Sequence, residues 1–180
     1  MGDRALIRIV DAALAEAVRK SGTWLACRPG CAPCCLGPFP ITPLDARRLG
    51  RGLAELEASD AIRAGNVRER ARNAPSDPGD DEPCPALDPA TGLCDLYAAR
   101  PITCRVFGPP MRTDEGPVGV CELCFAGAGE EEIAACATEI PAGSLEAELL
   151  RDLEAATGVS GDTTVARALL QGLGVSAPQS

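Results

Sequence analysis

The segment CRPGCAPCC, Cys27–Cys35, places four cysteines within nine residues of a chain that has ten cysteines and no histidine. The prolines and glycines of residues 25–40 predict an irregular loop rather than a helix or a strand. Disulfides are rare in a reducing cytosol, so this density of thiols in an intracellular chain favours metal ligation over cross-linking. Because ligation energy contributes to folding, we expect a metal to hold this loop in place.

Helical patterns lie on both sides of the loop. Apolar residues at helical spacing predict a helix over residues 3–20, and Thr42-Pro43 predicts the N-cap and first residue of a second helix. A third helix is expected to run to about Asn73. Further helices are expected near 130–139, 144–157 and 163–172, with Ser144 and Asp162 as N-caps. These segments surround the cysteine-rich loop in the sequence.

The middle of the chain is richer in turns. The stretch PALDPATGLCDLY, residues 85–97, has two short apolar runs around a turn and predicts a small hairpin. Prolines limit the helix that follows Pro101 to one or two turns. We therefore expect a mainly α fold with a small, irregular, hairpin-containing and cysteine-rich metal-binding core. We expect a single domain, residues 1–180, with this core at 27–125 between the helix at 3–20 and the helices of 130–172.

Charge and hydropathy exclude several partner classes. Residues 1–72 carry 12 basic and 8 acidic side chains, whereas the remainder is strongly acidic and brings the net charge to −9. This balance argues against a nucleic-acid partner. The basic run Arg47–Arg51 and the arginines after it indicate either a surface for an acidic protein partner or solvated helix faces. No stretch is long and apolar enough for a membrane partner, and no secretory signal is present, so we expect a cytoplasmic protein.

Two cysteine pairs have the spacing of metal ligands. Cys31 and Cys34, like Cys121 and Cys124, are separated by two residues, which allows a tight turn to direct both sulfurs at one ion. Together the two pairs can form a four-thiolate site. Neighbouring side chains diverge in extended backbone, so the adjacent Cys34 and Cys35 are not expected to serve one ion. The surplus of thiols leaves three interpretations open: two centres, one polynuclear cluster, or a thiol packed beside the ligands.

Nine cysteines lie outside the predicted long helices and are the candidate metal ligands. They are Cys27, Cys31, Cys34, Cys35, Cys84, Cys94, Cys104, Cys121 and Cys124. Without histidine the site must be thiolate-rich, which selects zinc or iron, including an iron–sulfur cluster. Arg100 and Arg105 follow ligand candidates closely and are candidates to hydrogen-bond the sulfurs. Cys136 falls in a predicted helix and is expected to be a core residue.

No catalytic residue can be assigned. A nucleophilic cysteine usually needs an organised base such as histidine, which the chain lacks. A thioredoxin-like Cys-x-x-Cys needs a βαβ context, and neither pair has one. The favoured function is therefore a metal-binding protein that holds zinc or an iron–sulfur cluster. The alternatives are an iron–sulfur-dependent oxidoreductase or protein-modifying enzyme, and a disulfide-stabilised domain.

CRPGCAPCC, followed by CPALDPATGLCDLYAARPITCRVF, resembles the zinc- or iron-chelating proteins named for their CxxCxxCC motif, the YkgJ-type proteins. The second block matches that family at Cys84-Pro85, Leu87-Asp88, Gly92, Cys94, Tyr97, Arg100-Pro101 and Cys104-Arg105. The resemblance covers about residues 27–125. It implies a metal site of eight cysteines: Cys27, Cys31, Cys34, Cys35, Cys84, Cys94, Cys104 and either Cys121 or Cys124.

The resemblance has one departure and one limit. Three residues rather than two separate Cys27 from Cys31, which leaves the role of Cys27 less defined than that of Cys31. Longer relatives include flagellin lysine methylases, but this chain is much shorter and has no recognisable S-adenosylmethionine site. The resemblance therefore implies a metal and not a particular reaction.

Overall fold

The computed structural model describes residues 2–113, 116–117 and 119–171. The chain forms two compact units, each assembled from separate parts of the sequence. The first unit contains Met1–Pro29 and Ile102–Gly158, and the second contains Gly30–Pro101 and Val159–Ser180. The boundary between Pro29 and Gly30 therefore falls inside the opening cysteine segment.

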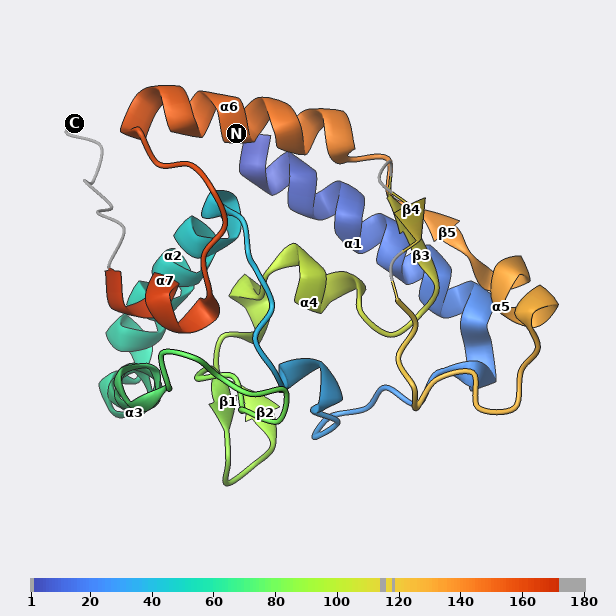
Figure 1. The fold of residues 1–180 in the computed structure, drawn as a ribbon, viewed down its shortest axis with the longest axis horizontal. Coiled ribbons are helices and arrows are strands. Elements are labelled where there is room, and N and C mark those ends of the chain that lie inside the picture. The colour runs from blue at the N-terminus through green and yellow to red at the C-terminus, as the bar shows by residue number, and fades with distance from the viewer. Residues whose placement is uncertain (1, 114–115, 118, 172–180) are drawn as a thin grey trace. The chain divides into compact units, whose positions relative to one another are not determined.

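The first unit is built on the long amphipathic helix α1, Gly2–Ser21. Its buried face carries Leu6, Val10, Ala13 and Ala17, which follow the spacing expected of one helix face. Helix α6, Gly143–Thr157, runs beside α1, and the short helix α4, Ile102–Val106, packs against it as well (Figure 1). Helix α5, Glu130–Cys136, contacts α1 too.

A small sheet completes the first unit. Strand β3, Met111–Thr113, pairs antiparallel with β4, Gly116–Pro117, and parallel with β5, Thr138–Glu139. The strand pattern was not apparent in the sequence, because the strands are two or three residues long and β4 consists of Gly and Pro.

The second unit packs three helices around one apolar core. They are α2, Pro43–Ser59, α3, Ala61–Asn73, and α7, Val165–Gln171. Leu49 and Leu53 of α2 meet Val67 of α3 and Leu169 of α7 in this core. The expected start of α2 is confirmed: Pro43 occupies the first turn, and the Thr42 hydroxyl accepts a hydrogen bond from the backbone N–H of Asp45.

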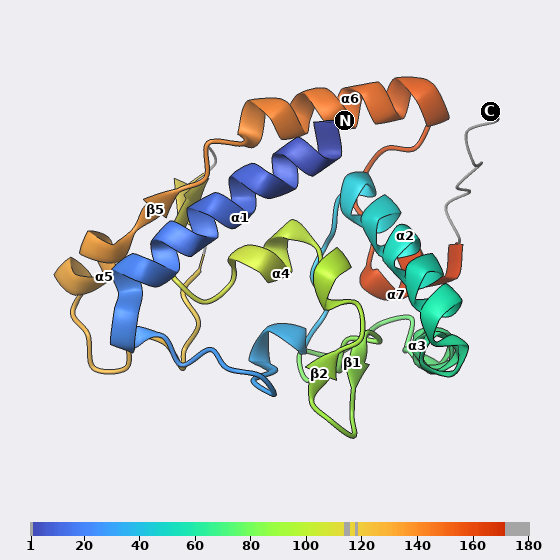
Figure 2. The same ribbon diagram turned by 180° about the vertical axis from the view of Figure 1, so that it is seen from behind.

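The predicted hairpin is present in the second unit. Strands β1, Leu87–Asp88, and β2, Leu93–Cys94, pair antiparallel, with Leu87 opposite Cys94 (Figure 2). Gly92 adopts a positive φ of 67° in the turn, which glycine permits without strain. The hairpin is followed by the 3-10 helix Tyr97–Ala99.

The mainly α fold class is confirmed, and so is the length of most predicted helices. Two predicted N-caps are wrong. Ser144 lies inside α6, which begins at Gly143, and α7 begins at Val165 rather than near Asp162. The Thr164 hydroxyl accepts the backbone N–H of Arg167 and takes the capping role instead. The single domain over 1–180 stays a prediction. No described helix combines the length and apolar character needed to cross a membrane.

Candidate metal centre

All ten cysteines lie in the described residues, and none forms a disulfide. The two units divide them equally. The first unit contains Cys27, Cys104, Cys121, Cys124 and Cys136, and the second contains Cys31, Cys34, Cys35, Cys84 and Cys94. The two Cys-x-x-Cys pairs therefore belong to different units, and their union in one four-thiolate site stays a prediction.

The adjacent Cys34 and Cys35 lie in a 3-10 helix, Pro33–Cys35, and not in extended backbone. The backbone N–H of Cys35 donates to the Ala32 carbonyl at 2.8 Å. The two thiols are hydrogen-bonded to each other. The premise that these neighbours diverge is therefore wrong, because the chain turns at this point instead of extending.

Backbone hydrogen bonds bring three distant cysteines of the second unit together. The Cys84 N–H donates to the Cys35 carbonyl at 2.7 Å, and an isolated bridge pairs Leu36 with Pro83. The Leu87 N–H donates to the Cys84 carbonyl, and Leu87 is paired with Cys94 across the hairpin. We call Cys34, Cys35, Cys84 and Cys94 the Cys84 group.

The Cys84 group has a mixed electrostatic environment. Burial raises the pKa of the Cys84 thiol to about 11, and burial also raises the pKa of Cys94. The hydrogen bond from Cys35 lowers the pKa of Cys34 to about 6, and the Arg100 charge contributes in the same direction. The pKa of Cys35 is raised by its hydrogen bond to Cys34, by burial, and by the charges of Cys34, Cys84 and Cys94.

Backbone N–H groups face several of the sulfurs. The nearby backbone N–H groups of Ala86 and Leu87 oppose the effect of burial on the pKa of Cys84. The N–H of Leu96, two residues after Cys94, likewise opposes the effect of burial on the pKa of Cys94. A donor two or three residues after each cysteine compensates the negative charge of a thiolate, as donors around metal-bound sulfurs do.

A charged clamp holds the hairpin that carries Cys94. The Asp95 carboxylate is 5% exposed and accepts two hydrogen bonds from Arg63, at 2.7 and 3.0 Å, and one from Arg70, at 2.6 Å. Arg70 also donates to the Pro85 carbonyl at 2.8 Å. Sequence reasoning missed this role, because Asp95 and the two arginines are far apart in the chain. Arg63 remains exposed and Arg70 is half-buried, and both hold the hairpin on α3 through Asp95.

The first unit contains a second set of neighbouring sulfurs. The Sγ atoms of Cys27 and Cys124 lie 3.9 Å apart, and the thiols of Cys121 and Cys124 are hydrogen-bonded. The Cys124 N–H donates to the Cys121 carbonyl at 2.8 Å, which closes the tight turn expected of this pair. Burial raises the pKa of Cys121, and the N–H groups of Leu123 and Cys124 oppose that effect. We call Cys27, Cys121 and Cys124 the Cys27 group.

Gly108 makes room for the Cys27 sulfur. A Cβ atom on Gly108 would lie 3.0 Å from the Cys27 Sγ, and Gly108 has a φ of 126° that side chains rarely adopt. Its carbonyl accepts the N–H of Cys121 at 3.3 Å. One glycine therefore contacts both ends of the Cys27 group.

An aromatic stack holds the two segments of the Cys27 group together. The rings of Trp24 and Phe125 are stacked with centroids 6.0 Å apart, and the Phe125 N–H donates to the Trp24 carbonyl at 2.9 Å. Phe125 has a left-handed φ of 57°, which is uncommon for a residue with a large side chain. The stack joins the backbone three residues before Cys27 to the residue immediately after Cys124.

The remaining candidates are placed as follows. Cys136 is buried among apolar neighbours, and its thiol donates to the Lys20 carbonyl at 3.4 Å, as expected of a core residue. Cys31 is half-buried in the second unit, and Cys104 lies on α4 in the first. We assign neither of these two to a group, and their ligand roles stay predictions.

The two arginines proposed beside the ligands have different surroundings. The Arg100 guanidinium lies 3.9 Å from the centroid of the Tyr97 ring, and its charge contributes to the lowered pKa of Cys34 and opposes the rise in the pKa of Cys94. Arg105 is buried and donates to the Asp11 carboxylate at 2.8 Å in the first unit. Arg100 is thus close enough to act on sulfurs electrostatically, whereas Arg105 ties α4 to α1. Direct hydrogen bonds from either arginine to a sulfur stay predictions.

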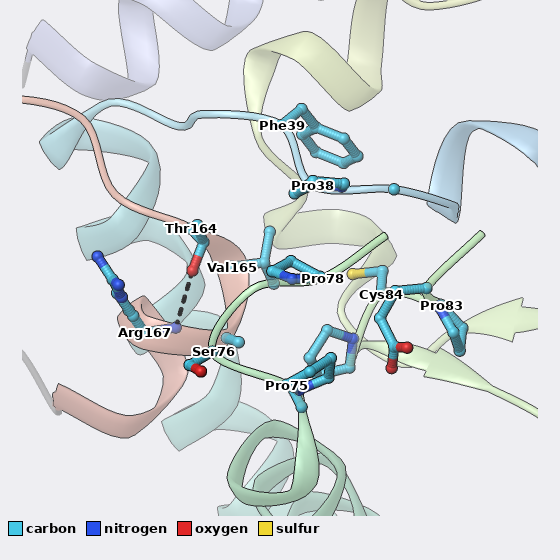
Figure 3. Close-up of a pocket in the computed structure, with 15 residues that line it drawn as sticks. Pro38, Phe39, Pro75, Ser76, Pro78, Pro83, Cys84, Thr164, Val165 and Arg167 are labelled. Atoms are coloured by element: carbon cyan, nitrogen blue, oxygen red, sulfur yellow. Dashed lines mark hydrogen bonds between the residues drawn. The ribbon is translucent and has the colours of Figure 1, made fainter. Parts of the chain in front are cut away.

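A mostly apolar pocket adjoins Cys84. Pro38, Phe39, Pro78 and Val165 contribute to its walls, and the Cys84 side chain lines it as well (Figure 3). All of its lining residues belong to the second unit.

A metal site requires several ligand side chains that converge on one point. Among residues 2–113, 116–117 and 119–171, no three Cys, Asp or Glu side chains already converge as ligands of one ion. The chemistry nevertheless fits a thiophilic metal, because the thiols are grouped and backbone N–H groups face the sulfurs of Cys84, Cys94 and Cys121. Rotation of cysteine side chains about χ1 is sufficient to redirect a sulfur without moving the backbone.

Comparison with known families agrees with this donor chemistry. Residues 26–124 match the family CxxCxxCC, described as "Putative zinc- or iron-chelating domain". The match covers more than half of the chain, and the chain therefore belongs to this family. Comparisons with curated proteins and with solved structures gave no match. Family membership and the grouped thiols together support metal binding.

Proposed function

We propose that the chain binds zinc or an iron–sulfur cluster through thiolates and that this binding completes the fold of its loop-rich segments. The observation that carries the proposal is the grouping of thiols from distant parts of the chain. The Sγ atoms of Cys27 and Cys124 lie 3.9 Å apart, and the backbone of Cys84 is hydrogen-bonded to that of Cys35. Grouped thiols can bind a thiophilic metal as thiolates.

The residues have distinct tasks in this proposal. The cysteines supply the ligands, and the backbone turns at Cys84–Leu87 and Cys121–Cys124 orient the sulfurs. Arg100 supplies positive charge near Cys34 and Cys94, where a site of several thiolates accumulates negative charge. Bound zinc would supply a structural cross-link, and a bound iron–sulfur cluster would add one-electron chemistry. We also place the protein in the cytoplasm, where a reducing environment keeps thiols available.

The direct test is elemental analysis of the full chain purified without oxygen, together with its absorbance spectrum. We expect at least one equivalent of zinc or iron per chain. Less than stoichiometric metal after anaerobic handling would contradict the proposal. A brown protein with visible absorbance would identify iron–sulfur chemistry, whereas a colourless zinc protein would rule out the iron–sulfur enzyme considered from the sequence.

A matched pair of variants separates ligands from buried thiols. Cys94→Ser should reduce bound metal, because its sulfur belongs to the Cys84 group. Cys136→Ser should retain the metal of the unmodified protein, since its thiol donates to the Lys20 carbonyl in an apolar core. Equal metal loss in both variants would show that the division between ligand and core residues is wrong.

A further inference from the structure

We infer that the cysteines form two separate metal centres, one built by the Cys84 group in the second unit and the other by the Cys27 group in the first. The inference rests on the proposed function and adds how the ligands are divided. Each centre would take a thiophilic ion, zinc or iron, because both groups consist of thiols alone.

The Cys84 group is positioned by contacts within its own unit. Cys84 is hydrogen-bonded to the backbone of Cys35, and Cys94 is held through its pairing with Leu87. The hairpin is in turn fixed to α3 by the Asp95 clamp. Four thiols are the number that a tetrahedral structural zinc site uses. The second unit therefore contains four thiols, the number that one tetrahedral ion needs, and rotation of their side chains would have to bring them onto that ion.

Positive charge accompanies the Cys84 group. Four thiolates around a divalent ion leave a net negative charge of about two. Arg70 donates to the carbonyl of Pro85, the residue after Cys84, at 2.8 Å, and Arg100 stacks on Tyr97, three residues after Cys94. These arginines belong to the same unit as the thiols, so the charge of the centre is offset locally.

The Cys27 group has the spacing of metal ligands on its own. With Zn–S bonds of about 2.3 Å, two sulfurs on one tetrahedral ion lie about 3.8 Å apart. The Cys27 and Cys124 sulfurs are 3.9 Å apart, which is far too long for a disulfide. Cys121 is joined to this pair by its hydrogen bond to Cys124. The geometry therefore already matches one edge of a thiolate site.

Gly108 and the aromatic stack support the Cys27 group from within the first unit. Gly108 leaves the space that the Cys27 sulfur occupies, and Trp24 and Phe125 fix the flanking backbone. The boundary between the units falls between Pro29 and Gly30 and separates Cys27 from the other cysteines of CRPGCAPCC. Two centres also account for the surplus of thiols over the four that one mononuclear site needs.

The test uses full-length protein loaded with ¹¹³Cd²⁺ and compares the double variants C84S/C94S and C121S/C124S. We expect two cadmium resonances from the unmodified protein. Each double variant should keep only the resonance of the group that it leaves intact. Metal content should fall by about half in each variant if one ion occupies each group. Loss of all metal in either variant, with both resonances absent, would overturn the inference in favour of one shared cluster.

The proposed function and the further inference fail differently in this experiment. If the unmodified protein binds neither native metal nor cadmium, metal binding itself is refuted. If it binds metal but shows a single thiolate environment, metal binding stands and the division into two centres is refuted. Trp24, the single tryptophan of the chain, reports independently on the Cys27 group. Its fluorescence should respond to metal in C84S/C94S and not in C121S/C124S, and the reverse pattern would overturn the assignment.

Glycine variants provide a second test that leaves every thiol in place. Gly108→Ala puts a Cβ 3.0 Å from the Cys27 Sγ, whereas Gly116→Ala puts one in open space. The two glycines have similar φ angles, 126° and 130°, so backbone strain is matched. Gly108→Ala should remove the resonance of the Cys27 group alone, and Gly116→Ala should retain both. Loss of both resonances in Gly108→Ala, or of neither, would overturn the proposed second centre.

Discussion

The two units hold similar sets of thiols by different physical means. In the second unit a nearly buried carboxylate, Asp95, is clamped by Arg63 and Arg70, and this clamp fixes the hairpin that carries Cys94. In the first unit the segment before Cys27 is held by stacked aromatic rings and by a glycine that leaves space for a sulfur. The difference shows that a set of thiols can be positioned by polar or by apolar contacts, and each kind of contact responds to different perturbations.

The largest predicted effects come from cavities in the two cores. Leu49→Ala in the second unit and Leu6→Ala in the first each remove a side chain that is at most 1% exposed. Each should lower the free energy of unfolding by about 2–5 kcal/mol. Hydrogen exchange measured by mass spectrometry should show faster exchange mainly in the unit that carries the substitution.

The control for these variants is Leu93→Ala, since Leu93 is 47% exposed on the hairpin. Its effect on unfolding should be within about 0.5 kcal/mol. If Leu49→Ala accelerated exchange equally in both units, the units would not be energetically distinct.

The next largest effect is expected from removing the charge of Asp95, which Arg63 and Arg70 clamp. Asp95→Asn removes the charge that three guanidinium hydrogen bonds engage and should destabilise the second unit by about 1.5–3 kcal/mol. Glu57→Gln is the matched control, because Glu57 is exposed and its ion pair with Arg68 is screened by solvent, so its loss should have little effect. Denaturant midpoints of the two variants give the comparison, and equal midpoints would contradict a special role for Asp95.

The aromatic stack is tested by Phe125→Leu, which keeps apolar volume but removes one ring. Loss of stacking should cost about 0.5–1.5 kcal/mol, in the first unit. Trp24→Phe retains a ring at the partner position and should cost less. Amide exchange of residues 24–27 is the measurement, and unchanged protection in Phe125→Leu would show that the stack does not hold this segment.

The smallest effect concerns the hairpin turn. The Thr91 hydroxyl and the Ala90 N–H donate to the Asp88 carboxylate, and these bonds lower its pKa. A lowered pKa in the folded state means that the contribution to stability is present at neutral pH and is lost as the pH falls through and below about 4. Asp88→Asn should therefore show a shallower loss of stability in acid than the unmodified protein. The measurement is the unfolding midpoint of each protein at several pH values between about pH 6 and pH 3. If the midpoints of the variant and the unmodified protein fell in parallel, the prediction would be contradicted.

Sequence reasoning predicted the features that depend on local patterns. Helix α1 follows from its apolar spacing, the start of α2 from Thr42-Pro43, and the hairpin from its turn. The sheet of β3, β4 and β5 was not predicted, because β3 and β5 pair across a long separation in sequence and carry little pattern of their own.

For the candidate site too, sequence reasoning predicted the local features and missed those that depend on tertiary contacts. The motif spacing predicted which cysteines are ligand candidates, and the tight turn at Cys121–Cys124 followed from it. Spacing cannot reveal that Cys27 is adjacent to Cys124 while Cys35 is adjacent to Cys84, since tertiary contacts decide both. The roles of Asp95 and Gly108 are likewise invisible in the sequence, because each acts on residues far away in the chain.

The discontinuity of the first unit has a consequence for the order of assembly during synthesis. Cys27 and Cys124 are separated by 97 residues, so at a ribosomal rate of ~5–20 residues per second Cys27 emerges about 5 to 20 s before its neighbour. The thiols of the Cys84 group are all synthesised within that interval. During that interval the nascent chain contains Cys27 and the Cys84 group but neither Cys121 nor Cys124, so the Cys84 group can form before the Cys27 group is complete.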